Sequence, residues 1–132
     1  MIIVDSNIFI FNESADSPER QQSLRKYEEA MLAGQLGINE VIVSEVFHRL
    51  QRLFGGAEAY SRMASIFSSP AITFMNFNQD TVMRAIRLAR DFNLRINDAL
   101  IAQQAIEMGA SVLTDDIKDF GKVKAVKVIP LR

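Results

Sequence analysis

The sequence predicts an α/β fold with three layers, α/β/α, around a central and mostly parallel sheet of four to five strands. Short β-branched apolar runs alternate along the chain with longer segments of helical periodicity, a pattern typical of a parallel sheet covered on both faces. The 132 residues are 48% apolar and 23% charged, as in an ordinary globular domain with a proper core. We therefore expect one domain over residues 1–132.

The first third of the chain is predicted to form two strands and one helix. Residues 1–5 are β-branched and apolar on both sides, as in a buried strand. A polar loop over 12–17 leads into a helix over 17–33, with a serine cap, proline at the first position and Gly34 after the last turn. Residues 36–38 then form a short second strand.

The segment 39–54 is ambiguous from its sequence. Residues 41–43 have β propensity, whereas Asn39 can cap a helix. We favour the helix, which ends at Gly55–Gly56 and is followed by another over 57–67. Its apolar face would carry Val43, Val46, Phe47 and Leu50.

The second half of the chain continues the alternation. A turn at Ser69-Pro70 precedes a third strand, and two helices follow, the second capped by Asn97 and ended by Gly109. A fourth strand and a probable edge strand complete the sheet before Pro130. The expected ranges are 72–75 for the third strand, 80–92 and 97–108 for the helices, and 111–114 and 125–129 for the last two strands.

The composition excludes several kinds of site. The chain has no cysteine, which rules out disulfides, thiolate zinc sites and a cysteine nucleophile, and its one histidine, His48, argues against a classical zinc site. The net charge of −1 does not indicate a nucleic-acid-binding protein, although basic residues can still gather on one face. The N-terminus lacks the features of a signal peptide, and no apolar stretch is long enough to span a bilayer. We expect a cytoplasmic protein without a membrane segment.

Carboxylates at the edges of apolar runs are the strongest chemical signal in the sequence. Removing a carboxylate from water is costly, so acids at the rim of a core need a cation or hydrogen bonds. Carboxylate oxygens suit Mg²⁺ or Mn²⁺. Ligands of parallel sheets bind beyond the carboxyl ends of the strands, where the strand order reverses, and we expect the acids to converge there. They are Asp5, Glu45, Asp98 and the pair Asp115–Asp116.

Each acid also has a purely structural interpretation. Asp5 could cap a following helix, and Asp98 could be an ordinary acid in the first turn of one. Glu45 could pair with Arg49 one turn later, and Asp115–Asp116 could belong to a turn. The metal-site hypothesis depends on the four positions taken together.

Four motifs in this order resemble a PIN domain. They are Asp5-Ser6-Asn7, Ser44-Glu45, the Asn-Asp-Ala-Leu-Ile-Ala run at 97–102, and the Thr-Asp-Asp-Ile-Lys-Asp-Phe run at 114–120. The resemblance spans nearly the whole chain. The small single-domain form is similar to the VapC ribonuclease toxins of bacterial and archaeal toxin–antitoxin pairs. Ser6 stands where threonine is more frequent in the family, a change that keeps the hydroxyl.

The resemblance implies a metal-dependent endoribonuclease that cleaves RNA phosphodiester bonds with water activated by Mg²⁺ or Mn²⁺. Asp116 fits the spacing of the last acidic position best, and Asp115 and Asp119 compete with it. The implied catalytic and metal-binding acids are Asp5, Glu45, Asp98 and Asp116. The implied supporting groups, which orient a carboxylate, a water or a phosphate, belong to Ser6, Asn7 and Thr114.

The resemblance also implies three partners: an RNA substrate, an antitoxin protein and a second copy in a homodimer. Arg49 and Arg52 share a helical face with Glu45 and could reach an RNA backbone. A solvated face is the alternative, both for them and for a second basic strip formed by Arg84, Arg87, Arg90 and Arg95.

Two other functions stay open at the level of sequence. A PIN-like scaffold could bind RNA or a protein without cutting, although the intact acidic set argues against it. A phosphoacceptor receiver-like domain also carries acids at strand ends, but it would have its acidic pair early and a lone aspartate mid-chain. Here the pair is late.

Overall fold

The computed structural model describes all 132 residues and confirms the α/β/α architecture. Its sheet has five strands in the order β3-β2-β1-β4-β5, and every neighbouring pair is parallel. The predicted mostly parallel sheet is therefore fully parallel. The strands are β1 (Ile2–Val4), β2 (Leu36–Ile38), β3 (Ile72–Phe74), β4 (Ser111–Thr114) and β5 (Lys127–Pro130).

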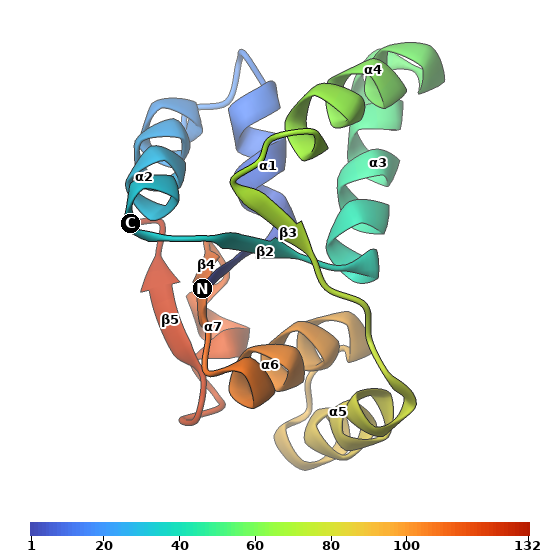
Figure 1. The fold of residues 1–132 in the computed structure, drawn as a ribbon, viewed down its shortest axis with the longest axis vertical. Coiled ribbons are helices and arrows are strands. Elements are labelled where there is room, and N and C mark those ends of the chain that lie inside the picture. Colours follow the sequence, from blue (N-terminus) through green and yellow to red (C-terminus); the bar gives the residue numbers. More distant parts are fainter.

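Helices cover both faces of this sheet. Figure 1 shows α1 to α4 gathered on one side of it, with α5 and α6 on the other. The helices are α1 (Ser6–Glu13), α2 (Arg20–Ala33), α3 (Glu40–Phe54), α4 (Gly56–Phe67), α5 (Gln79–Phe92), α6 (Ile96–Met108) and α7 (Ile117–Phe120). No helix is both long and apolar enough to cross a membrane.

The core explains why the central strands read as continuous apolar runs. Ile3 and Val4 of β1 and Val112 and Leu113 of β4 are completely buried, because helices lie over both faces of these strands. Above the sheet, Phe9 of α1 packs edge-on against Tyr27 and Phe67, with ring centroids 5.7 and 5.5 Å apart. This packing fixes α1, and with it the chain that leaves β1.

Helix α3 settles the ambiguous segment in favour of the helix. The side chain of Asn39 caps it by accepting a hydrogen bond from the Ile42 N–H at 3.0 Å. The predicted apolar face is buried at Val46 and Leu50, and Gly55 ends the helix with a positive φ of 84°. The amphipathic period therefore outweighs the β propensity of residues 41–43.

Several predicted boundaries were wrong. Residues 6–13 form helix α1, which the sequence analysis did not assign, and α7 is a further short helix. Helix α2 starts at Arg20 rather than at Ser17, whose hydroxyl instead bonds the Glu19 carboxylate at 2.6 Å. The cap position of α6 is Arg95, so Asn97 lies inside the first turn and its side chain is free for another contact. Strand β5 starts two residues later than predicted, at Lys127.

The strand order also bears on the receiver-like alternative. Receiver-like domains have the order 2-1-3-4-5, in which β1 lies between β2 and β3. Here β1 lies between β2 and β4, and β3 is at the edge. The topology is therefore that of a different α/β fold.

Candidate functional site

The direction of strand order changes between β1 and β4. From β1 the chain adds β2 and β3 on one side, and it then crosses to add β4 and β5 on the other. In parallel sheets, ligands bind at such a point, beyond the carboxyl ends of the strands. Asp5 follows β1 directly, and Thr114 is the last residue of β4. These two residues are 109 positions apart in the chain and in hydrogen-bond contact.

Asp5 is a buried carboxylate held by three donors. Its Oδ1 accepts from the Ser6 N–H at 2.8 Å, and its Oδ2 accepts from the Thr114 hydroxyl at 2.7 Å and the Asn7 amide at 3.5 Å. Asp5 is 5% exposed, and this burial raises its pKa to about 6. The hydrogen bonds from Thr114 and Ser6 lower the pKa, while the negative charges of Glu45 and Asp98 raise it. No basic side chain pairs with Asp5.

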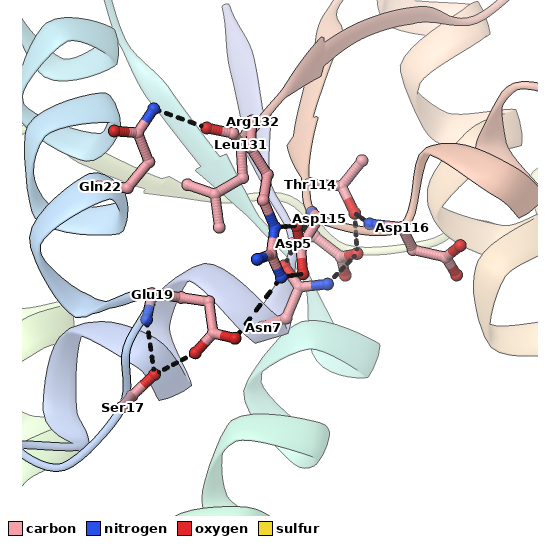
Figure 2. Close-up of polar contacts among 10 residues, drawn as sticks. All are labelled: Asp5, Asn7, Ser17, Glu19, Gln22, Thr114, Asp115, Asp116, Leu131 and Arg132. Carbon is pink, nitrogen blue, oxygen red and sulfur yellow. Dashed lines mark hydrogen bonds and ion pairs between the residues drawn. The ribbon is translucent and has the colours of Figure 1, made fainter.

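Thr114 and Asn7 join the ends of the two strands (Figure 2). The Thr114 hydroxyl donates to Asp5 and accepts from the Asp116 N–H at 2.9 Å. The Asn7 side-chain oxygen accepts from the Asp115 N–H at 3.3 Å. The loop after β4 is therefore positioned by the residues that follow β1. The contribution of Ser6 comes from its backbone N–H.

Asp98, Asp116 and Asp119 form a carboxylate cluster. One oxygen atom from each lies within 4.8 Å of the other two. Asp98 comes from the first turn of α6 and is 4% exposed, whereas Asp116 and Asp119 come from the start of α7. Asp116 caps α7 by accepting from the Asp119 N–H at 3.2 Å. The atoms that could bind a metal here are carboxylate oxygens, with no histidine or cysteine among them. Such a set suits a hard divalent cation such as Mg²⁺ or Mn²⁺.

Two basic side chains neutralise part of this cluster. The Arg95 guanidinium faces Asp98 with both ends, at 3.2 and 3.4 Å, and Lys122 lies 3.2 Å from Asp119. Burial raises the pKa of Asp98, against the opposing effect of Arg95, and the charges of Asp116 and Asp119 raise it further. Lys122 lowers the pKa of Asp119. Asp116 pairs with no cation.

Glu45 approaches this site from α3. Its Oε2 accepts a hydrogen bond from the Asn97 amide at 3.4 Å, a contact between α3 and α6. The structural interpretation of Glu45 as a partner of Arg49 was wrong, because the two form no ion pair. Arg49 and Arg52 are exposed, and neither pairs with a carboxylate. Glu45 acts on the pKa of Asp5 through its charge, as does Asp98.

Comparison with known proteins identifies the fold. The family model of the PIN domain matches residues 2–126. This chain belongs to the PIN-domain family. No curated protein sequence matches it.

Solved structures with the same fold as this PIN domain include three from bacteria. A toxin–antitoxin complex from Klebsiella pneumoniae has a TM-score of 0.72 and 22% identity, over 100% of this chain and 98% of the other. VapBC2 from Rickettsia felis, bound to a DNA fragment from their promoter, has a TM-score of 0.77 and 18% identity, over 98% of both chains. VapC20 from Mycobacterium tuberculosis, a toxin that cleaves the sarcin–ricin loop, has a TM-score of 0.75 and 18% identity, over 94% and 98%. At these identities the likeness establishes the fold.

The three candidates for the last acidic position lie in two different environments of this PIN domain. Asp116 and Asp119 lie with Asp98, whereas Asp115 faces away from them. Both Asp115 oxygens accept from the Arg132 guanidinium, at 3.1 and 3.0 Å, and Arg132 also lies 3.5 Å from Glu19 (Figure 2). Asp115 thus belongs to an ion-pair network on the opposite side of the loop.

Three polar residues near the acids in this PIN domain were not assigned to the site from sequence. Arg95 was placed only in a basic strip, although its spacing of three residues from Asp98 is that of a helical ion pair. Asn97 was interpreted as a helix cap. Arg132 carries no local signal, since its partners lie 17 and 113 positions away.

Proposed function

We propose that this PIN domain is a metal-dependent endoribonuclease that hydrolyses RNA phosphodiester bonds with Mg²⁺ or Mn²⁺. The observation that carries the proposal is the convergence of Asp98, Asp116 and Asp119 within 4.8 Å, beside the buried and unpaired Asp5. Like charges held this close are unfavourable unless a cation shares them. Membership of a family whose VapC toxins are generally ribonucleases adds independent support.

Each acid has a role in this proposal. Asp98 and Asp116 would hold the cation, with Asp119 as a third ligand, and Asp5 and Glu45 would add negative charge beside it. A bound divalent ion would supply an acidified water and neutralise charge on the scissile phosphate. Thr114 and Asn7 bond Asp5 to the loop after β4, so that Asp5 keeps a fixed distance from the acids of that loop.

We further propose that the chain is the toxin of a toxin–antitoxin pair, acting as one domain over residues 1–132 in the cytoplasm. The similar solved structures include toxin–antitoxin complexes, which supports an antitoxin protein as partner. A homodimer is part of the same proposal. Light scattering of the purified chain tests the dimer, and co-purification with the product of the neighbouring gene tests the antitoxin.

The decisive experiment compares cleavage by the wild type with cleavage by Asp98→Asn. Purified protein is incubated with a panel of structured and single-stranded RNAs in Mg²⁺ or Mn²⁺, with an EDTA control. Asp91→Asn is the matched control, since Asp91 is an exposed aspartate on α5 that pairs with Arg90. We expect cleavage by the wild type and the control, and none by Asp98→Asn or with EDTA. Equal cleavage by all three proteins would falsify the assignment.

The alternative is a PIN-like scaffold that binds RNA or protein without cutting. It gains weight if no RNA is cleaved although the wild type is folded. Two of the three clustered acids already have an internal basic partner, which is the one observation in its favour. A scaffold would bind RNA equally well with and without divalent ions.

A further inference from the structure

We propose that Arg95 is a positioning residue that alternates between Asp98 and the RNA. In the metal-free protein it neutralises Asp98, and when a divalent cation occupies the carboxylate cluster it turns to a phosphate of the bound RNA. This inference rests on the proposed function, because it requires that the cluster binds a divalent cation.

The contact between Arg95 and Asp98 uses the same atoms that a cation needs. The Arg95 Nε faces Oδ2 of Asp98 at 3.2 Å, and its Nη2 faces Oδ1 at 3.4 Å. Both carboxylate oxygens are thus engaged by the guanidinium. A divalent ion shared by Asp98, Asp116 and Asp119 must displace at least one of these contacts. The two cations would also repel each other at that separation.

Arg95 cannot respond by losing its charge, because guanidinium stays protonated in proteins. It can respond by moving. Its side chain is 73% exposed, and both contacts are longer than the usual 2.7–2.9 Å of a charged N–H···O⁻ hydrogen bond. No second side chain holds the guanidinium. The negative charges of Glu45 and Asp116 also attract the guanidinium and raise its pKa, after the larger effect of Asp98.

Lys122 provides the contrast within the same cluster. Its ammonium lies 3.2 Å from Asp119 and also donates to the backbone oxygen of Asn93 at 3.4 Å. Its side chain is 35% exposed, about half the value for Arg95. Lys122 is therefore held in place by a second acceptor, whereas Arg95 depends on Asp98 alone.

A phosphate is the natural second partner for the released side chain. The fork of N–H donors in guanidinium matches the oxygens of a phosphate as well as it matches a carboxylate. An RNA phosphate that approaches a cation held by Asp98 comes close to Arg95, because Arg95 contacts Asp98 and is exposed. Arg95 would then make the metal-bound protein bind RNA more tightly than the metal-free protein.

The test uses Arg95→Gln, with Arg25→Gln as the matched control, since Arg25 is an exposed arginine of α2 that bonds Gln22 on the same helix. Calorimetry with Mn²⁺ and no RNA measures the first half of the proposal. We expect Arg95→Gln to bind Mn²⁺ about two- to fivefold more tightly than the wild type, the range of an exposed ion pair. Arg25→Gln should match the wild type.

Binding of a fluorescent single-stranded RNA in Ca²⁺, with the RNA verified intact on a gel, measures the second half. Arg95→Gln should bind RNA more weakly, and its slope of log affinity against log salt should be smaller by about 0.7, the loss of one phosphate contact. Arg95→Lys keeps the charge and should retain the slope. Opposite effects on Mn²⁺ and RNA are not produced by simple loss of structure.

The outcomes separate the two proposals. If the wild type binds no Mn²⁺, both the proposed function and the role of Arg95 are overturned. If the wild type binds Mn²⁺ and cuts RNA while Arg95→Gln behaves as Arg25→Gln does in both assays, the role of Arg95 alone is wrong. Tighter Mn²⁺ binding with an unchanged salt slope would overturn the contact to RNA.

Discussion

Asp115 and Asp116 are neighbours in the chain but face two different environments. Asp115 is fully paired, with Arg132 on both oxygens and Glu19 beyond it. Asp116 shares a small volume with two other carboxylates and has no basic partner. One aspartate thus completes a network of ion pairs, while the other contributes to an unbalanced negative charge. The comparison teaches that closeness to other carboxylates, rather than position in a motif, distinguishes the candidate ligand Asp116 from the structural acid Asp115.

The largest difference is expected in cleavage. Asp98→Asn removes a charge from the unbalanced cluster and should lower the cleavage rate by about 1000-fold, since metal-assisted charge stabilisation is worth several kcal/mol. Asp115→Asn keeps the size of its side chain and leaves the cluster intact, so its rate should stay close to that of the wild type. Rates under identical Mn²⁺ concentrations decide the matter. A similar loss in both variants would place Asp115 in the site.

The pH dependence of stability tests Asp5, which has no basic partner. Its pKa is raised from 3.8 to about 6, so the folded protein holds this proton more tightly than the unfolded chain does. The resulting stabilisation is complete below about pH 4 and is lost as the pH rises through 6, by about 3 kcal/mol in total. Urea titrations in EDTA at pH 5 and 7.5 should show about half of this loss, because the other half falls below pH 5.

Asp5→Asn is the variant that isolates this effect. The loss between pH 5 and 7.5 should be smaller in the variant than in the wild type. Addition of Mn²⁺ should restore the wild type at pH 7.5, because ligand binding to the folded state stabilises it. An identical pH profile in both proteins would contradict the role of Asp5.

The Thr114 hydroxyl joins Asp5 and Asp116, the two acids without a basic partner, and it is the next target. Thr114→Val removes the shortest hydrogen bond to the Asp5 carboxylate and leaves the Asp116 N–H without a partner, at a cost of about 1–3 kcal/mol in the free energy of unfolding. Thr114→Ser keeps the hydroxyl and should lose much less. Chemical denaturation at pH 7.5 measures both. Equal losses would mean that the methyl group, and not the hydroxyl, is what matters.

The smallest effect is expected on the paired side. Arg132→Gln removes an ion pair in which the arginine is 63% exposed, so it should cost at most about 1 kcal/mol of stability. Its cleavage rate and Mn²⁺ affinity should equal those of the wild type. The double variant with Asp115→Asn should cost less than the sum of the two single variants, because they remove the same contact. A large change in Mn²⁺ affinity would show that the network also positions the cluster.

The same contrast explains how much could be predicted from sequence. Strands β1 and β4 and helix α3 were predictable, since continuous apolar runs and a capped amphipathic period are local signals. Helix α1 was not, because its four central residues are all apolar and show no period; Ile8 and Phe9 are buried in the core. Tertiary packing, rather than pattern, makes this segment a helix.

The acids, too, could be predicted where the signal is local and not where it depends on tertiary structure. Asp5 and Asp98 could be placed at the edge of the sheet because each directly follows or opens an element. The choice between Asp115 and Asp116 depended on the path of a loop, in which a shift of one residue reverses the direction of the side chain. Asp119 was named only as a competitor, and its place beside Asp116 results from the short turn of α7. The contacts of Arg132 could not be predicted from the sequence, because its partners are distant in the chain.

The hydrogen bond between Thr114 and Asp5 has a consequence for biosynthesis. Its two residues are separated by 109 positions, and Asp116 and Asp119 follow even later in the chain. A ribosome makes Asp5 109 positions before Thr114, so the strand that must pair beside it is completed much later. A partly made chain that lacks Asp116 and Asp119 therefore has no assembled acidic cluster. On the proposed function, RNA close to the growing chain would not be cleaved before these residues have been made.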